Sequence, residues 1–108
     1  MPQHDHHDKN SRVVHNAAEH RFQIDTNGQL SVLEYVFKKH RIFLKHTEVP
    51  PSLQDQGLGT KLAHAALEYT RRNELIAVPT CPFVKKYVDA HPEYQSSVAG
   101  SGLNKRRS

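Results

Sequence analysis

The chain has 108 residues, a formal net charge of +4 and a sequence pI near 9.4. This length supports one domain, and the single cysteine excludes an internal disulfide. The charge favours an anionic partner, which a phosphorylated cofactor, an acidic protein or a nucleic acid would each provide. Residues 1–8 lack the apolar region of a secretory signal, and no stretch approaches the ~20 apolar residues that cross a bilayer. We therefore expect no membrane partner and a cytoplasmic, or at least intracellular, protein, with the nucleus left open.

The composition of both ends predicts disordered tails. Residues 1–11 are polar throughout, and from residue 96 the composition turns to Ser, Gly, Lys and Arg. Three histidines near the start, at positions 4, 6 and 7, could capture a divalent metal, but a short His-rich arm is more often a solvated tail, so we assign no metal. The folded domain is expected over residues 12–95.

Alternation of polar and apolar residues predicts strands in the first half of the domain. Val13 and Val14 open a short strand, residues 21–25 and 30–37 form two more, and residues 41–49 form another. Asn27 and Gly28 both tolerate positive φ, which predicts a tight turn between the second and third strands. Two prolines end the last strand, because proline cannot donate to a β ladder.

The apolar period changes after Gly57 and predicts helices in the second half. Apolar side chains recur on one helical face from residue 57 to 72, and residues 75–79 form a short buried strand. Cys81 is the expected N-cap of a second helix, which starts at Pro82 and ends near His91. Strands followed by helix, strand and helix predict an α+β (α/β layered) domain.

The segment Gln-Asp-Gln-Gly-Leu-Gly at residues 54–59 lies between a predicted strand and the start of a predicted helix. The first amides of a helix have no intrahelical acceptor, and the helix dipole adds roughly half a positive charge there, so the segment suits a phosphate. A glycine-containing loop that merely opens a helix is an equally good explanation of the two glycines alone. A Walker loop and the dinucleotide fingerprint both fail, since their additional glycines are missing and position 62 is Leu.

Gln54, Gly57 and Gly59 match the Gln/Arg-x-x-Gly-x-Gly/Ala signature of the GNAT acetyltransferase superfamily. With the segments His-Thr-Glu-Val-Pro at 46–50, Cys-Pro-Phe-Val-Lys-Lys-Tyr at 81–87 and His-Pro-Glu-Tyr at 91–94, the chain resembles the short, minimal branch of that superfamily over about residues 13–95. The resemblance implies a mostly antiparallel central sheet flanked by two main helices, with acetyl-CoA as cofactor. Asp55 departs from the pattern, because that branch often has Gly there.

The resemblance also implies where coenzyme A binds. The strand that ends at Val49 would splay from its neighbour and pair its backbone with the pantetheine arm, and a backbone amide near Val49 would polarise the thioester carbonyl. The segment at the start of the helix would hold the pyrophosphate. The residues expected to bind the cofactor are Glu48, Val49, Gln54, Asp55, Gln56, Gly57, Leu58, Gly59, Thr60, Lys61 and Lys85.

Cys81 and His46 are the candidate catalytic residues. A helix N-terminus favours a thiolate at Cys81, which could accept an acetyl group and pass it to an amine. The alternative is that Cys81 is a small buried hydrophobe. If Cys81 does not react, the amine attacks the thioester directly, and His46 is the candidate base because its ordinary pKa is close to neutral. A strand histidine is more often a surface or hydrogen-bonded residue.

These features predict an acetyl-CoA-dependent N-acetyltransferase acting on an amine acceptor. The chain has no room for the helices that wall off the acceptor in longer members of the superfamily, so the open cleft favours either a peptide or protein amine or a dimer that completes the site. A non-catalytic CoA or acyl-CoA-binding module is the alternative, and it would need neither catalytic candidate. A nucleic-acid-binding protein is the third hypothesis, suggested by the pI and the basic residues 105–107, but no binding motif or aromatic platform supports it. The sequence leaves monomer and homodimer both open.

Overall fold

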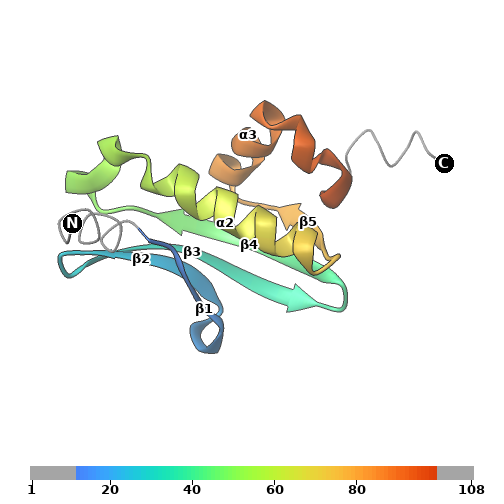
Figure 1. Cartoon of the computed structure of the whole chain (residues 1–108), viewed down its shortest axis with the longest axis horizontal. Helices are drawn as coiled ribbons and strands as arrows, with labels where there is room; N and C mark the ends of the chain where they lie inside the picture. The colour runs from blue at the N-terminus through green and yellow to red at the C-terminus, as the bar shows by residue number, and fades with distance from the viewer. Residues whose placement is uncertain (1–11, 100–108) are drawn as a thin grey trace, which may run out of the picture.

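The computed structural model describes residues 12–99, so the expected arm at residues 1–11 and residues 100–108 of the second tail lie outside the described part. A five-stranded sheet in the order β1-β2-β3-β4-β5 forms one layer, and α2 lies across it with α3 near β5 (Figure 1). The strands are β1 Val14–Asn16, β2 Arg21–Thr26, β3 Gln29–Lys38, β4 Arg41–Glu48 and β5 Ile76–Pro79. The α-helices are α2 Leu58–Arg72 and α3 Pro82–Ala90, and the 3₁₀ turns are η1 Ala17–Glu19, η2 Pro51–Gln56 and η3 Pro92–Ser97.

The sheet is antiparallel except at its last pair, where β4 and β5 run parallel. This arrangement confirms the predicted mostly antiparallel α+β fold with two main helices. The predicted turn is also confirmed, because Asn27 and Gly28 have φ of 51° and 88° between the paired residues Thr26 and Gln29. An oxygen of Asp25 accepts a hydrogen bond from the Gly28 amide at 2.8 Å and closes the turn.

One face of the sheet carries the core. Side chains that alternate along β2, β3, β4 and β5 are buried on this face, and both helices cover it. The chain crosses from β4 to its parallel neighbour β5 through α2, and from β5 to the parallel bridge between Ala77 and Val98 through α3. Both crossovers proceed in the same direction across the sheet, so two right-handed crossovers place both helices on the same face. The buried cluster includes Phe22, Ile24, Leu33, Tyr35, Ile42, Leu44, Ala77, Leu58, Leu62, Ala66, Leu67, Val84 and Val88.

The packed structure continues past the expected boundary at residue 95. Ser97 and Val98 are buried, Val98 forms an isolated bridge with Ala77, and the Ala99 amide donates to the Ala77 carbonyl at 2.9 Å. The second tail therefore cannot begin at residue 96 as expected from composition. Composition did not show this, because the contacts use backbone groups at the free edge of β5 and a single apolar side chain.

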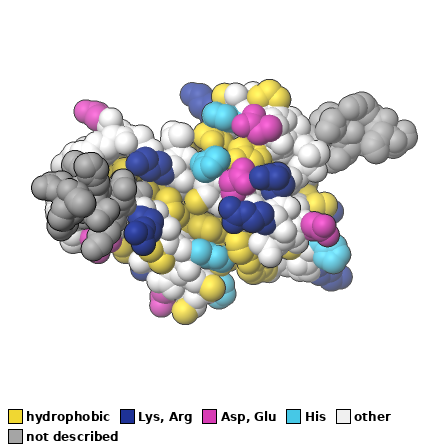
Figure 2. Space-filling model, in the orientation of Figure 1, with side chains coloured by type: hydrophobic (Ala, Val, Ile, Leu, Met, Phe, Trp, Pro, Cys, Tyr) yellow, Lys and Arg dark blue, Asp and Glu magenta, His cyan; other side chains and the backbone are white. Residues whose placement is uncertain are grey.

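Figure 2 shows the helix-covered face, where histidine, acidic and basic side chains gather over the central helix, with apolar surface between them. Exposed residues of α2 include Lys61, His64 and Arg72. Within residues 12–99, neither helix is long and apolar enough to cross a membrane.

Candidate functional site

The strands β4 and β5 separate halfway along β4. They pair only between Arg41–Leu44 and Ile76–Pro79, and the Leu44 carbonyl then accepts hydrogen bonds from the amides of both Thr80 and Cys81 at 3.1 Å. The register between β3 and β4 also shifts here, which leaves Lys45 as the extra residue of a bulge. Beyond this point β4 pairs with β3 alone, so among the described residues no strand pairs with its other edge at residues 45–48, where the Thr47 amide hydrogen-bonds Cys81.

The segment after β4 is fixed at both ends. Leu53, in η2, is buried in the core and anchors the turn, and Gly57 adopts a left-handed φ of 72° where η2 gives way to α2. The side-chain amide of Gln54 donates to the Val49 carbonyl at 3.0 Å. Gln54 therefore ties the loop to the end of β4.

The first turn of α2 presents amides without helical partners. The backbone bond from Lys61 to the Gly57 carbonyl, at 3.1 Å, is the first in the helix, and Gly57 supplies no side-chain cap. The amides of Leu58, Gly59 and Thr60 precede that bond. Together with the positive end of the helix dipole, they suit an anionic group.

Gly59 is required by a close approach of α3 and not by its own backbone angles. A Cβ atom built at this position would lie 3.0 Å from Cζ and 3.2 Å from Cε2 of Phe83. The Phe83 ring is 41% exposed, so it stands beside the first turn of α2 and faces solvent on its other side.

These parts surround a cleft of about 360 Å³, lined by Thr47, Val49, Gln54, Gly57, Gly59, Thr60 and Phe83. Five of the expected cofactor-binding residues are therefore brought together. Leu58 can contribute only its amide, since its side chain is 3% exposed and packs in the core. Glu48, Asp55, Gln56, Lys61 and Lys85 are exposed and do not line the cleft.

The sequence analysis missed Thr47 and Phe83 as cleft residues. Thr47 pairs with Leu33, so it points to the helix-covered face, whereas its neighbours on β4 point the other way. The alternation of side chains along the strand that Pro50 ends could have indicated that Thr47 points to the opposite face from His46 and Glu48. Phe83 belongs to the quoted Cys-Pro-Phe segment, but nothing local indicates that its ring reaches α2.

Cys81 occupies the N-cap of α3, as predicted, and is 5% exposed. Its Sγ lies 3.4 Å from Oγ1 of Thr47, the residue that lines the cleft. Burial raises the pKa of the Cys81 thiol, but hydrogen bonds from the Thr47 side chain and from the amides of Val84, Phe83 and Thr47 outweigh burial and lower the pKa below 9.0. A thiol with a lowered pKa therefore lies beside Thr47 at the wall of the cleft.

His46 is not brought to this thiol. It pairs with Glu34 and lies on the sheet face opposite Thr47. Its Nε2 is 3.3 Å from Oε1 of Glu48, and the two side chains are 56% and 70% exposed. A base at this position would face solvent on the far side of the sheet.

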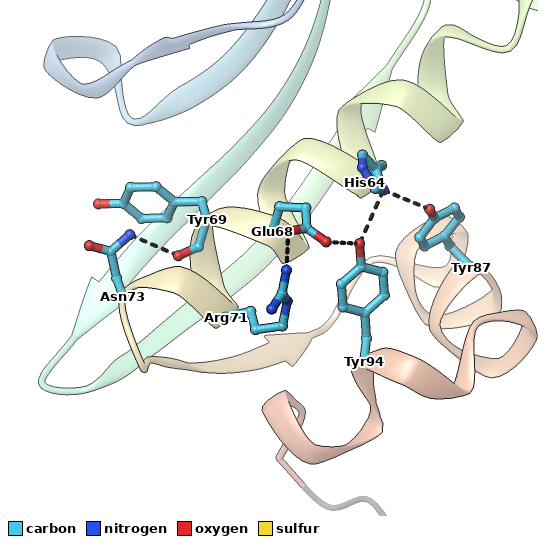
Figure 3. Close-up of polar contacts among 7 residues, drawn as sticks. All are labelled: His64, Glu68, Tyr69, Arg71, Asn73, Tyr87 and Tyr94. Atoms are coloured by element: carbon cyan, nitrogen blue, oxygen red, sulfur yellow. Dashed lines mark hydrogen bonds and ion pairs between the residues drawn. The ribbon is translucent and has the colours of Figure 1, made fainter.

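A second polar cluster fastens η3 to α2 (Figure 3). The hydroxyl of Tyr94, which is 1% exposed, donates to Oε2 of Glu68 at 2.6 Å and lies 3.1 Å from Nδ1 of His64. Arg71 donates to the other oxygen of Glu68 at 2.6 Å. Hydrogen bonds from Tyr94 and Arg71 lower the pKa of Glu68, and burial together with Glu68 raises the pKa of Tyr94.

Within residues 12–99, no group of three His, Cys, Asp or Glu side chains is arranged to hold a metal ion.

Comparison with known proteins places this geometry in a family. Residues 21–97 match the family described as GCN5-related N-acetyl-transferase. Protein NATD1 from Homo sapiens is 37% identical over 84 residues, which cover 75% of this chain and 74% of that protein, and Protein NATD1 from Danio rerio is 35% identical over 89 residues, covering 77% and 80%. The NMR solution structure of a GCN5-like putative N-acetyltransferase from Staphylococcus aureus matches with a TM-score of 0.67 and 32% identity, covering 84% of this chain and 90% of that one.

The family match spans more than half of the chain and includes both sides of the cleft, from β4 through α2 to the N-terminus of α3. The chain therefore belongs to the GCN5-related N-acetyltransferase family, as a short acetyltransferase.

Proposed function

We propose that this acetyltransferase uses acetyl-CoA and transfers the acetyl group to a peptide or protein amine. The observation that carries the proposal is the convergence of two sets of free backbone groups on one cleft. The first set is the amides of residues 58–60, and the second is the edge of β4 that has left β5, apart from the Thr47 amide that bonds Cys81.

The residues present fit coenzyme A in chemistry and in placement. The amides at the start of α2 would hold the pyrophosphate, with Lys61 adding an exposed positive charge nearby. The free edge of β4 offers backbone donors and acceptors to the amides of the pantetheine arm. Asp55 is exposed and lies outside the lining, so its carboxylate does not exclude an anionic ligand.

Cys81 is the proposed nucleophile. Its thiolate attacks the thioester carbonyl carbon, a new carbon–sulfur bond forms, and the bond to the sulfur of coenzyme A breaks to release the coenzyme A thiolate. An amine then attacks the acetylated Cys81, loses a proton to solvent and regenerates the thiolate. His46 has no part in this route, because it lies on the opposite face of the sheet.

An open acceptor side favours a large acceptor. Between β1 and β2 the chain has only η1, three residues long, so no helix from this region walls off the cleft among the described residues. A small amine would have few enclosing contacts there. A peptide or protein can instead supply its own binding surface beside the cleft.

Intact-protein mass spectrometry after incubation with acetyl-CoA tests the covalent route. We expect a gain of about 42 Da, one acetyl group, that is absent in Cys81→Ala. The matched control is calorimetric titration of both proteins with acetyl-CoA, which should show similar affinity because Cys81 does not line the cleft. Loss of the adduct with retained transfer to a peptide amine would refute Cys81 as the nucleophile.

An assay of coenzyme A release, run beside this titration, separates catalysis from simple binding. Binding of acetyl-CoA without release of coenzyme A in the presence of amine or peptide acceptors would support the alternative, a coenzyme A-binding module. The burial of Cys81 favours that alternative, since a buried thiol can be purely structural.

A further inference from the structure

Gln54 lines the cleft, but its side chain reaches back to the end of β4. The side-chain nitrogen of Gln54 donates to the Val49 carbonyl at 3.0 Å. The free amides that suit a pyrophosphate begin at Leu58, in the first turn of α2. The other polar atom of a glutamine side chain is a carbonyl oxygen, which only accepts hydrogen bonds and therefore does not bind an anion. The contact that the structure gives Gln54 is thus with the strand.

Val49 is held on both of its sides. Pro50 follows Val49 and restricts it to an extended conformation, so the alternation of the strand continues through Val49. On one side, Glu48 is paired with Val32 of β3. On the other side, the hydrogen bond from Gln54 fixes the direction of the Val49 carbonyl. The two peptide groups that flank Val49 are therefore both held in orientation.

The amide of Val49 points to the edge of β4 that borders the cleft. The Thr47 amide hydrogen-bonds the Cys81 sulfur, and Cys81 lies on the side of β4 away from β3, where its own amide bonds the Leu44 carbonyl. Backbone groups of alternate strand residues point to the same edge, so the Val49 amide points to this edge too. Within residues 12–99 the Val49 amide forms no hydrogen bond. Because Val49 lines the cleft, its amide is a donor open to a ligand.

We propose that Gln54 is a positioning residue for acetyl transfer: it orients Val49 so that the Val49 amide donates to the thioester carbonyl oxygen of acetyl-CoA. This inference rests on the proposed use of acetyl-CoA. Because Gln54 occupies the Val49 carbonyl, Val49 offers the cleft a donor and not an acceptor. Negative charge develops on the thioester oxygen as the Cys81 sulfur bonds to the carbonyl carbon, before the bond to the sulfur of coenzyme A breaks. The Val49 amide stabilises that charge, and Gln54 acts only through Val49.

Infrared spectroscopy of the thioester carbonyl tests this role without turnover. The probe is acetyl-CoA that carries an isotope label at the thioester carbonyl carbon, bound to Cys81→Ala, which has no sulfur to acetylate. We expect a lower carbonyl stretching frequency in Cys81→Ala than in the double variant Cys81→Ala with Gln54→Met. The double variant lacks the hydrogen bond that aligns the Val49 amide, so its thioester carbonyl is less polarised. Equal frequencies in the two proteins would overturn the proposal.

The rate of Cys81 acetylation at saturating acetyl-CoA measures the size of the effect. We expect the rate to fall at least about tenfold in Gln54→Met, which is part of the roughly 10²–10³-fold loss that follows removal of an oxyanion donor. Gln54→Arg keeps a donor and should retain most of the rate. The matched control is Gln95→Met, because the Gln95 side-chain amide also donates to a backbone carbonyl, that of Val88 at 3.3 Å, outside the cleft. The control should keep the wild-type rate, and circular dichroism melting shows whether each variant is folded.

Calorimetric titration separates this role from binding of the pyrophosphate. The probe is 3′-phosphoadenosine 5′-diphosphate, which carries the diphosphate of coenzyme A without the pantetheine arm. We expect Gln54→Met to bind this probe within about twofold of the wild type, whereas a loss of about tenfold would assign Gln54 to the pyrophosphate and overturn the proposal. A wild-type rate of acetylation in Gln54→Met would overturn it as well.

Failure of the proposed function gives different results. A wild-type chain that binds no acetyl-CoA refutes the proposed function, and the role of Gln54 with it. A chain that binds acetyl-CoA without acetylating Cys81 refutes only the covalent route, and the infrared comparison then decides the role of Gln54.

Discussion

Gly57 and Gly59 stand two residues apart, yet the structure predicts different consequences when each is replaced by alanine. Gly57 has a φ of +72°, and a Cβ atom there would meet no atom within 4 Å. The cost of Gly57→Ala is therefore confined to the backbone, since an L-residue in the left-handed region loses roughly 1–2 kcal/mol. Part of this is offset by the smaller conformational entropy of the unfolded alanine chain. We expect a net loss of about 1 kcal/mol in the free energy of unfolding, or a fall in Tm of roughly 4–8 °C for a domain of this size.

Gly59→Ala should behave in the opposite way. The residue is in α2 with no positive φ, so the higher helix propensity of alanine is worth up to about 1 kcal/mol in favour of folding. The new Cβ would lie 3.0 Å from the Phe83 ring, which is partly exposed and can rotate away. We expect the displaced ring to turn into the cleft, which it already lines. We expect little change in stability and an affinity for acetyl-CoA that falls about tenfold, equivalent to roughly 1.4 kcal/mol.

Urea denaturation followed by circular dichroism measures the first effect, and calorimetric titration with acetyl-CoA measures the second. Gly57→Asn is the control for backbone strain, because asparagine tolerates the left-handed region, and it should be more stable than Gly57→Ala. Adding Phe83→Ala to Gly59→Ala should remove the steric effect of the new methyl group. Wild-type stability in Gly57→Ala would refute the backbone argument, and equal losses of affinity with and without the Phe83 ring would refute the steric one.

The other predictions concern titratable groups. Thr47→Val removes a hydrogen bond that lowers the pKa of Cys81, so iodoacetamide should alkylate the thiol more slowly at pH 7 than in the wild type; an unchanged rate across a pH series would contradict this role of Thr47. Tyr94→Phe should cost roughly 1–2 kcal/mol in urea denaturation, because the buried hydroxyl donates to Glu68, and no loss would show that the bond adds nothing. The folded state lowers the pKa of Glu68, so its contribution is present above the ordinary pKa of 4.5 and is lost as pH falls through the lower folded value; Glu68→Gln should flatten the dependence of stability on pH in that acid range. Burial lowers the pKa of His15 below its ordinary value of 6.5, so the unfolded chain binds this proton more readily than the folded protein. The free energy of unfolding should therefore decrease as the pH is lowered below 6.5, and it should decrease less steeply in His15→Gln than in the wild type.

Much of the fold was predictable because its signals are local. The positive φ at Asn27 and Gly28 follows from two residues that tolerate it, and α2 follows from apolar spacing over four turns. The end of α2 was placed correctly at Arg72. Leu75 was expected in β5, but its amide bonds to the Thr70 carbonyl at 2.9 Å, so it belongs to the turn after the helix. Strand ends depend on which neighbour pairs with them, which local propensity does not specify.

The candidate site was predicted where it consists of backbone groups. Gly57 and Gly59 are the residue type that a helix start near a phosphate requires, and the structure leaves the amides of the first turn free for one. Side chains were harder to place. His46 and Thr47 are neighbours in the sequence, but a strand points them to opposite faces, and only Thr47 meets Cys81.

The sequence alone determined the parts that depend on near neighbours along the chain: the strand alternation, the glycine loop, the helix start at Pro82 and the family signature they compose. Only the tertiary structure decided which distant groups meet. It brought Phe83 against Gly59, set Thr47 beside Cys81 and paired Val98 with the edge of β5. Such contacts arise from packing elements that are far apart in the sequence, so no local propensity specifies them. The same packing placed both helices on one face of the sheet and left the other face uncovered within residues 12–99.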